Sequence, residues 1–335
     1  MTLILMSLVC AVVVFAQDPH FSQFYSSPLT LNPAFTGKFN GDLRIAGNYR
    51  NQWPTINNAY TTGTVSADFA ILKNSVAQND TWGVGIMALT DQSANGAVAY
   101  NYAALSTAYH KSLDENGFKQ LGLGFQASYS NMNIYVNKLT FEDQLAPDGT
   151  FSLPSQEQFN GTTLKKSYLD LNAGVLYTNS ITEHDNMYVG VSMYHITRPE
   201  MSFLPKGFQT LNSRVTFQAG GYFLVGGRNT LHLSGMHSIQ AGANETLLGG
   251  AIQLPVGDAD YDEKPVSVYA GLWARFKDAA IPYIGLDFSD FHLGATYDIN
   301  TSELKTASNS RGGVEISLIY IKQPPGAKGL PCPKF

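Results

Sequence analysis

Apolar and polar side chains alternate along much of this chain. In residues 121–129, Leu, Leu, Phe, Ala and Tyr hold every second position, and Gly, Gly, Gln and Ser hold the positions between them. Neighbouring side chains of a strand point to opposite faces, so this period of two predicts a strand and not a helix. The same pattern recurs in 265–276, 290–298 and 311–321.

From residue 42 onward, clusters of Asn, Asp, Gly, Ser and Pro separate such segments from one another. The fourteen predicted strands are 42–50, 62–72, 82–91, 97–111, 119–131, 166–179, 186–196, 213–226, 229–240, 245–254, 265–276, 280–288, 290–298 and 311–321. Many reach the roughly 9–11 residues that a strand needs to cross a bilayer, whereas strands of soluble proteins average about 5–6. Strand length therefore favours a membrane barrel over a soluble sandwich.

The charged residues inside these segments share one face. They lie among the small and polar side chains, at Arg44, Asp170, Arg214, Arg275, Asp298 and Glu315. A charge facing lipid at mid-bilayer costs about 2–4 kcal/mol, so this segregation predicts an apolar surface against lipid and a polar, wet lumen. The expected fold is an all-β, transmembrane antiparallel β-barrel in an outer membrane.

Composition agrees with this fold and excludes one class of partner. Charged residues make up 14% of the chain, against about 25% in a typical soluble protein, and aromatic residues make up 12%. So little charge cannot cover an ordinary soluble surface. The net charge of −5 includes no basic block, so we expect no nucleic acid partner.

Loop lengths predict an orientation for the barrel. The long connections 51–61, 132–165, 197–212 and 299–310 all follow odd-numbered strands. Outer-membrane barrels have short periplasmic turns and longer external loops, so we expect these connections outside the cell and both ends of the mature chain in the periplasm. The connection 132–165 is long enough to bind a partner, and a plain solvated loop is the alternative.

Residues 1–16 form an uncharged apolar run that predicts a signal peptide, with a buried strand or short anchor as the alternative. Val9 before Cys10 does not fit a lipidation site, and cleavage after residue 16 would leave Cys332 without a disulfide partner in the chain. The expected divisions are a signal peptide (1–16), a mature N-terminal segment (17–41), the barrel (42–321) and a C-terminal tail (322–335).

Candidate metal and phosphate motifs are weak. His232 and His237 are five residues apart, which places them on opposite faces of a strand. The acidic loop 258–263 lacks the sixth-position glycine and the acidic twelfth residue of an EF-hand. Gly122 and Gly124 lie in the middle of a predicted strand, which favours packing over phosphate binding. We predict no metal and no cofactor.

Catalysis has no clear candidate either. The chain contains no Gly-x-Ser-x-Gly motif. Barrel enzymes can use Ser and His without that motif, but Ser192 and His195 are three residues apart and should point to opposite faces of a strand. We therefore predict no catalytic residue and a protein that is not an enzyme.

The predicted mature N-terminus carries a recognisable signature. Residues 17–37 read QDPHFSQFYSSPLTLNPAFTG and closely resemble the opening of the PorP/SprF family. The resemblance continues in Asn51-Gln-Trp-Pro54, in 187–192, in 297–302, in 312–320 and in the ending Cys332-Pro-Lys-Phe335. The connection 132–165 departs from the family pattern, so the choice of partner could differ there.

The resemblance implies an outer-membrane barrel of the type IX secretion and gliding machinery. It implies a non-enzymatic role with a secreted surface protein such as an adhesin, and with periplasmic and lipoprotein components of the machinery. The first alternative is a channel for a small hydrophobic ligand, and an enzyme barrel is the second. The segment 17–37 also contains the candidate residues for contacting a partner or plugging the lumen, and its four aromatic residues carry too much apolar surface to hang free. The candidate residues are Phe21, Phe24, Tyr25, Asn32, Pro33 and Phe35.

Overall fold

The computed structural model describes residues 18–56, 59–72, 76–157, 162–182, 184–203, 209–256 and 266–323. The predicted signal peptide, the acidic loop 258–263 and Cys332 lie outside the described residues. The strands are β1 (Leu43–Gln52), β2 (Tyr60–Ile71), β3 (Thr81–Ser93), β4 (Val98–Ser112), β5 (Lys119–Tyr135), β6 (Thr163–Ser180), β7 (Asn186–Tyr194), β8 (Arg214–Val225), β9 (Asn229–Gln240), β10 (Ala243–Val256), β11 (Val266–Arg275), β12 (Ala279–Phe288), β13 (Phe291–Asn300) and β14 (Arg311–Lys322).

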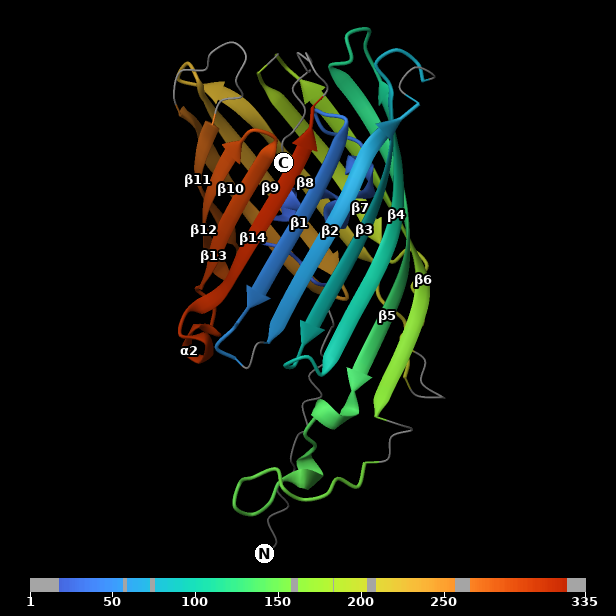
Figure 1. Cartoon of the computed structure of the whole chain (residues 1–335), viewed down its shortest axis with the longest axis vertical. Coiled ribbons are helices and arrows are strands. Elements are labelled where there is room, and N and C mark those ends of the chain that lie inside the picture. Colours follow the sequence, from blue (N-terminus) through green and yellow to red (C-terminus); the bar gives the residue numbers. More distant parts are fainter. Residues whose placement is uncertain are drawn as a thin grey trace, which may run out of the picture.

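These strands form a closed antiparallel barrel in which each strand pairs with its neighbours in sequence (Figure 1). The ring closes between β1 and β14, from the pair Leu43 and Lys322 to the pair Gln52 and Gly313. Closure satisfies the backbone hydrogen-bonding groups that an edge strand would expose. The predicted fold class is confirmed, with strand bounds that shift by a few residues; the largest shift extends β5 to Tyr135.

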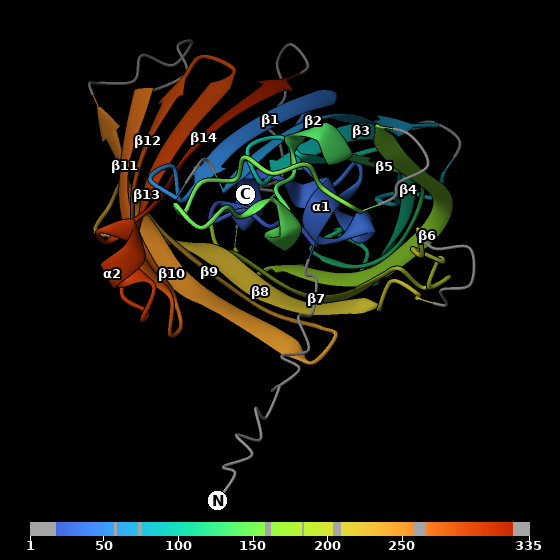
Figure 2. The ribbon, with the colours of Figure 1, turned by 90° about the horizontal axis from the view of Figure 1, so that it is seen from below.

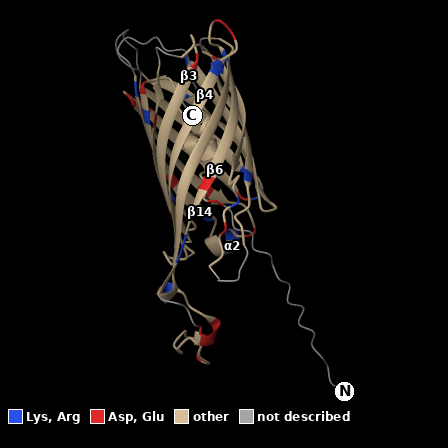
Figure 3. Cartoon of the chain, turned by 90° about the vertical axis from the view of Figure 1, so that its right-hand side faces the viewer, with Lys and Arg blue, Asp and Glu red and all other residues tan. Residues whose placement is uncertain are grey.

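The outer wall carries the apolar half of each alternating segment. Leu123, Phe125 and Tyr129 are 49%, 61% and 55% exposed, while the intervening Gln126 and Ser128 are buried in the barrel. Figure 3 shows charged residues mostly near the two ends of the barrel, with a largely uncharged wall between them. Within the described ranges, no helix has the length and apolar character to cross a membrane.

The charges inside the strands face the lumen, as the sequence predicted. Of the six predicted positions, all but Arg214 are at most 5% exposed, and Arg214 is partly buried at the start of β8. Polar side chains that face inward can pair with one another away from lipid, which accounts for the alternation along the strands.

Residues 18–41, called the lumen segment below, lie inside the barrel. They contain η1 (Phe24–Ser26), α1 (Pro28–Leu31) and η2 (Pro33–Phe35), three short helices whose residues are nearly all buried. Figure 2 looks along the barrel and shows α1 within the ring of strands. A single-turn helix has few hydrogen bonds of its own, so the wall has to hold this segment in place.

The lumen segment crosses the barrel from one rim to the other. We call the rim where β5 and β7 end the long-loop rim, and the rim where β1 begins the short-turn rim. Asp18 bonds to Gln240, the last residue of β9, at the long-loop rim, and Asp42 N donates to Lys322 O at the short-turn rim. Asp18 and Lys322, near the two ends of the described chain, therefore lie at opposite rims. This contradicts the expectation that both ends of the mature chain share one rim, which ignored the path that precedes β1.

Candidate functional site

Asn32 and Pro33 attach the middle of the lumen segment to β6 and β7. Asn32 has extended backbone and caps η2, with its side-chain oxygen accepting from Ala34 N at 2.8 Å. Its amide nitrogen donates to the carbonyls of Val175 (3.1 Å) and Val191 (3.3 Å) in the wall. Pro33 follows at the first helical position, where its missing N–H costs nothing. Both residues are buried, so this dipeptide serves as an anchor inside the barrel.

Glycines in the wall let the backbone of the lumen segment approach closely. A Cβ atom on Gly124 would fall on the backbone of Pro33 and Ala34, and one on Gly174 would fall on the Asn32 side chain. A Cβ atom on Gly83 would likewise meet the backbone of Thr36. The prediction that Gly124 is a packing glycine is confirmed, and the partner it packs against is the lumen segment.

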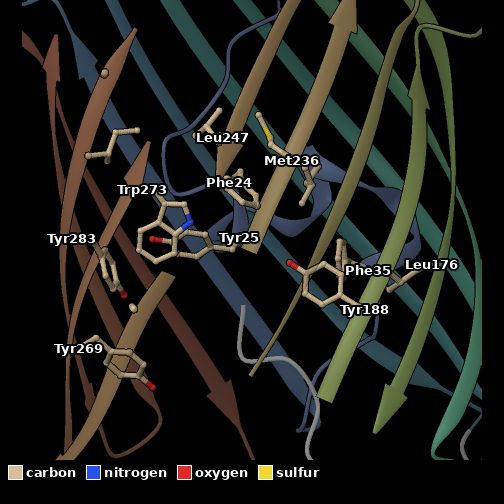
Figure 4. Close-up of a cluster of buried hydrophobic side chains, with 14 of the residues drawn as sticks. Phe24, Tyr25, Phe35, Leu176, Tyr188, Met236, Leu247, Tyr269, Trp273 and Tyr283 are labelled. Carbon is tan, nitrogen blue, oxygen red and sulfur yellow. The ribbon is translucent and has the colours of Figure 1, made fainter. Parts of the chain in front are cut away.

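The predicted aromatic residues pack against aromatic residues of the wall. Tyr25 packs against both Trp273, at a centroid distance of 4.9 Å, and Tyr283, at 6.0 Å. Phe35 meets Tyr188 edge to face at 5.5 Å. Figure 4 shows both contacts within one buried cluster. Phe21 and Phe24 are also 3% exposed, so the structure buries every predicted aromatic residue inside the barrel.

A buried charge network holds the start of the lumen segment. Glu315 accepts from Ser22 N at 2.7 Å and from Gln23 N at 3.0 Å. The Ser22 hydroxyl donates to Asp298 at 2.7 Å and accepts from Arg50 and Arg275. Both arginines also pair with Asp298, at 2.9 and 3.0 Å. Paired charges of this kind tolerate burial, whereas loss of one partner is costly.

A second ion pair holds the end of the lumen segment near the short-turn rim. Arg44 donates two hydrogen bonds to Asp68, each at 2.9 Å, and one to Phe35 O at 3.0 Å. Asp68 in turn accepts from Gly37 N at 2.7 Å. Asp68 and Arg50 were missed at the sequence level, although both occupy inward positions by the alternation of their strands.

A cluster at the long-loop rim, called the rim cluster below, binds Asp18. The His195 imidazole contacts Asp18 at 2.7 Å through Nε2 and Asp170 at 2.6 Å through Nδ1. Gln240 donates to the Asp18 carboxylate at 3.0 Å, and Arg214 Nε lies 3.4 Å from it. His195, Asp170, Arg214 and Gln240 form the rim cluster, and Asp18 is the residue that it binds.

The charges of the rim cluster stabilise one another. Burial alone would lower the pKa of His195, but the carboxylates of Asp18 and Asp170 outweigh burial and raise that pKa to about 9. Burial alone would raise the pKa of Asp18, but His195 and Arg214 hold it well below its usual range. Asp18 and His195 therefore carry opposite charges at neutral pH.

The predicted geometry of Ser192 and His195 is wrong. Both face the lumen, because His195 follows the end of β7 and turns inward with a positive φ of 57°. Ser192 Oγ donates to Leu31 O at 2.7 Å, while His195 contacts Asp18 and Asp170. The two side chains are thus engaged with different parts of the lumen segment.

His232 and His237 lie on opposite faces of β9, as predicted. His232 is buried beside the lumen-facing Tyr269 ring, whereas His237 pairs across the strands with Phe217, which is exposed on the outer wall. Among the described residues, no three His, Cys, Asp or Glu side chains are arranged to hold a metal ion.

The connection between β5 and β6 projects beyond the long-loop rim (Figure 1). It contains η3 (Val136–Lys138) and η4 (Glu142–Gln144), and a backbone bridge joins Leu145 to Phe151. Leu145, Phe151 and Leu153 are 47%, 55% and 44% exposed, and we call these three residues the apolar tip. Another short helix, α2 (Lys305–Ser308), lies in the connection before β14 at the same rim.

Solved structures share the barrel fold at low sequence identity. The Ralstonia pickettii toluene transporter TbuX is 9% identical, with a TM-score of 0.50 over 89% of this chain and 93% of that chain. The Pseudomonas putida toluene transporter TodX is 8% identical, with a TM-score of 0.47 over 91% and 94%. No curated protein sequence matches the chain.

A family model does match nearly the whole sequence. The model described as "Type IX secretion system membrane protein PorP/SprF" covers residues 13–320, which include the lumen segment and almost all of the barrel. The chain therefore belongs to the PorP/SprF family of type IX secretion membrane proteins, as an outer-membrane β-barrel.

Proposed function

We propose that this protein is a non-enzymatic outer-membrane component of type IX secretion that anchors, or helps to export and display, a secreted surface protein such as an adhesin. Family membership supports a role in that secretion system. In this proposal the long-loop rim faces the cell exterior and holds the secreted protein. The short-turn rim then meets periplasmic and lipoprotein components of the machinery.

The apolar tip is the observation that carries this proposal. Apolar side chains on the barrel wall face lipid, but the apolar tip lies in a connection that projects past the rim. Exposed apolar groups clustered on a surface outside lipid commonly mark a protein contact. Asp143 accepts from Ser155 Oγ at 2.9 Å, which joins the residues on the two sides of the tip.

A channel for a small hydrophobic ligand is the second candidate. The likeness of fold to TbuX, which is described as a toluene transporter, favours it. The lumen segment opposes it, because residues 18–41 fill the barrel and are fixed to the wall at both rims. Transport would require this segment to move.

Substitution of the apolar tip tests the first candidate. The variant carries Leu145→Ser, Phe151→Ser and Leu153→Ser, and the matched control carries Leu113→Ser, which is 54% exposed in the turn between β4 and β5 at the opposite rim. Each protein is purified from mildly solubilised outer membranes, and the co-purifying proteins are identified by mass spectrometry. We expect a secreted surface protein with the parent and the control, and its loss with the tip variant.

Two outcomes would contradict the proposal. If a correctly inserted tip variant retained the partner, the apolar tip would not be the surface that binds it. Absence of any stoichiometric partner from the parent protein, together with flux of an aromatic hydrocarbon into reconstituted vesicles, would favour the channel.

A further inference from the structure

The rim cluster holds Asp18 in the way that a peptide-binding site holds one residue of its ligand. The Gln240 side chain accepts from Asp18 N at 2.9 Å and donates to the Asp18 carboxylate at 3.0 Å. One amide thus contacts both the backbone and the side chain of the same residue. His195 and Arg214 supply two cationic groups to that carboxylate. The contact with His195 is a charged hydrogen bond, one of the stronger kinds in proteins, and Arg214 adds a nearby positive charge.

The groups that receive Asp18 are fixed by contacts of their own. Asp170 orients His195, and the Arg214 guanidinium stacks over the Tyr194 ring at 4.4 Å. Gln240 also donates to Asn212 O at 3.2 Å. Because these contacts do not involve Asp18, the site keeps its shape when Asp18 leaves. A site built in advance binds a ligand at a lower ordering cost.

Space lies on both sides of the bound residue. Two cavities share Asp18, Pro19, Thr30 and Arg214 in their linings. One cavity continues past Phe21, Met236 and Glu245, and the other continues past Tyr100, Tyr102 and Tyr194. The dipeptide Asp18-Pro19 therefore borders both cavities, beside the cationic groups.

We propose that the rim cluster and its two cavities form a binding site for an acidic peptide segment, which Asp18-Pro19 occupies in cis. The inference rests on the proposed function, in which a secreted protein at this rim supplies the competing segment. The carboxylate of that segment takes the place of the Asp18 carboxylate between His195, Arg214 and Gln240. The anchors from Ser22 onward stay in place, so only the first residues of the lumen segment move.

A segment of the partner has to displace Asp18, which is covalently tethered to its site. A residue joined to its site by a few bonds competes at an effective concentration of about millimolar or more. A free acidic segment displaces Asp18 only if a second contact adds to its affinity. The apolar tip at the same rim could supply that contact, which would make engagement of both sites a condition for tight binding.

The test uses purified full-length barrel in detergent and a fluorescent probe peptide, fluorescein-Gly-Ala-Asp amide. The Asn version of the probe is its control. Asp18→Ala removes the cis carboxylate, so we expect this variant to bind the Asp probe at least tenfold more tightly than the parent, as measured by fluorescence anisotropy. Adding Arg214→Gln to Asp18→Ala should abolish the gain, and the Asn probe should show no gain with any variant.

Equal binding of the Asp probe by the parent and by Asp18→Ala would overturn the proposal. Equal binding of the Asp and Asn probes by Asp18→Ala would also overturn it. Thermal unfolding of each variant checks that the barrel is intact. Because no partner protein is present, failure of this assay leaves the apolar tip experiment to decide the proposed function independently.

Discussion

Replacement of Asn32 should loosen the lumen segment without breaking the barrel. Asn32→Ala removes two hydrogen bonds donated to wall carbonyls and leaves the buried Ala34 N–H without its acceptor. An orphaned buried N–H costs about 1–3 kcal/mol, and each lost bond about 0.5–1.5 kcal/mol, so the total is about 2–6 kcal/mol. Since 1.4 kcal/mol is a factor of ten, the lower limit already predicts a roughly thirtyfold rise in the opening of the segment.

A buried thiol can report this opening. Ser26 is fully buried, and its hydroxyl has no hydrogen-bond partner within the described structure, so Ser26→Cys is a mild change. The reporter is made in a Cys332→Ser background, in protein refolded from residue 17 onward, so that no other thiol reacts. The rate of modification by a thiol reagent then follows the population of the open segment, and we expect Asn32→Ala to raise it at least thirtyfold.

Asn133→Ala provides the matched control. Asn133 lies near the end of β5 and donates to Asn131 at 2.6 Å, away from the lumen segment, so its replacement should leave the rate unchanged. A rate for Asn32→Ala within threefold of the reporter parent, in a barrel that unfolds at the same temperature, would refute the anchoring role of Asn32.

Three further perturbations probe the same interior. Gly124→Ala places a Cβ on the lumen segment, so overpacking of about 1–3 kcal/mol should raise the reporter rate, whereas Gly63→Ala, whose Cβ comes no nearer than 3.6 Å to any neighbour, should not. Because the pKa of His195 is raised to about 9, the stabilisation that its charge gives to the bound Asp18 is complete below pH 6.5 and is lost as the pH rises through about 9. The reactivity of the thiol in Pro19→Cys should therefore rise more steeply at alkaline pH than the reactivity of a free thiol. Arg50→Met leaves buried carboxylates with one cation fewer, which should cost about 3–5 kcal/mol and lower the unfolding midpoint of the barrel on heated gels; an unchanged midpoint would contradict the pairing.

The strands were predictable because every side chain that faces the bilayer has to be apolar, which produces the alternation along each strand. In β11, Val268 and Leu272 lie outside, and Tyr269 and Trp273 lie inside, as the alternation indicated. The end of β5 at Tyr135 was less predictable. Beyond the lipid both faces of a strand can meet water, so alternation no longer marks its residues.

The position of the N-terminal segment could not be decided from its own residues. Phe21 and Phe35 require cover, but an outside partner and the lumen would both supply it. The decisive signal lay elsewhere, in inward-facing glycines such as Gly83 and Gly124, because a glycine in the middle of a strand often marks the close approach of another backbone. The rim cluster joins Asp18 to residues 177 and 222 positions away, a pairing that no local pattern contains.

The path of the lumen segment also constrains the order of assembly. Residues 18–41 precede β1 and lie inside a ring that closes only when β1 pairs with β14, the last strand of the chain. Threading these residues into a finished ring would drag their aromatic side chains past the polar and charged side chains that line the lumen. We therefore expect the hairpins from β2 to β13 to gather around the segment first, with the seam between the two terminal strands forming last. The residues that fill the barrel would then act as the template on which it is built.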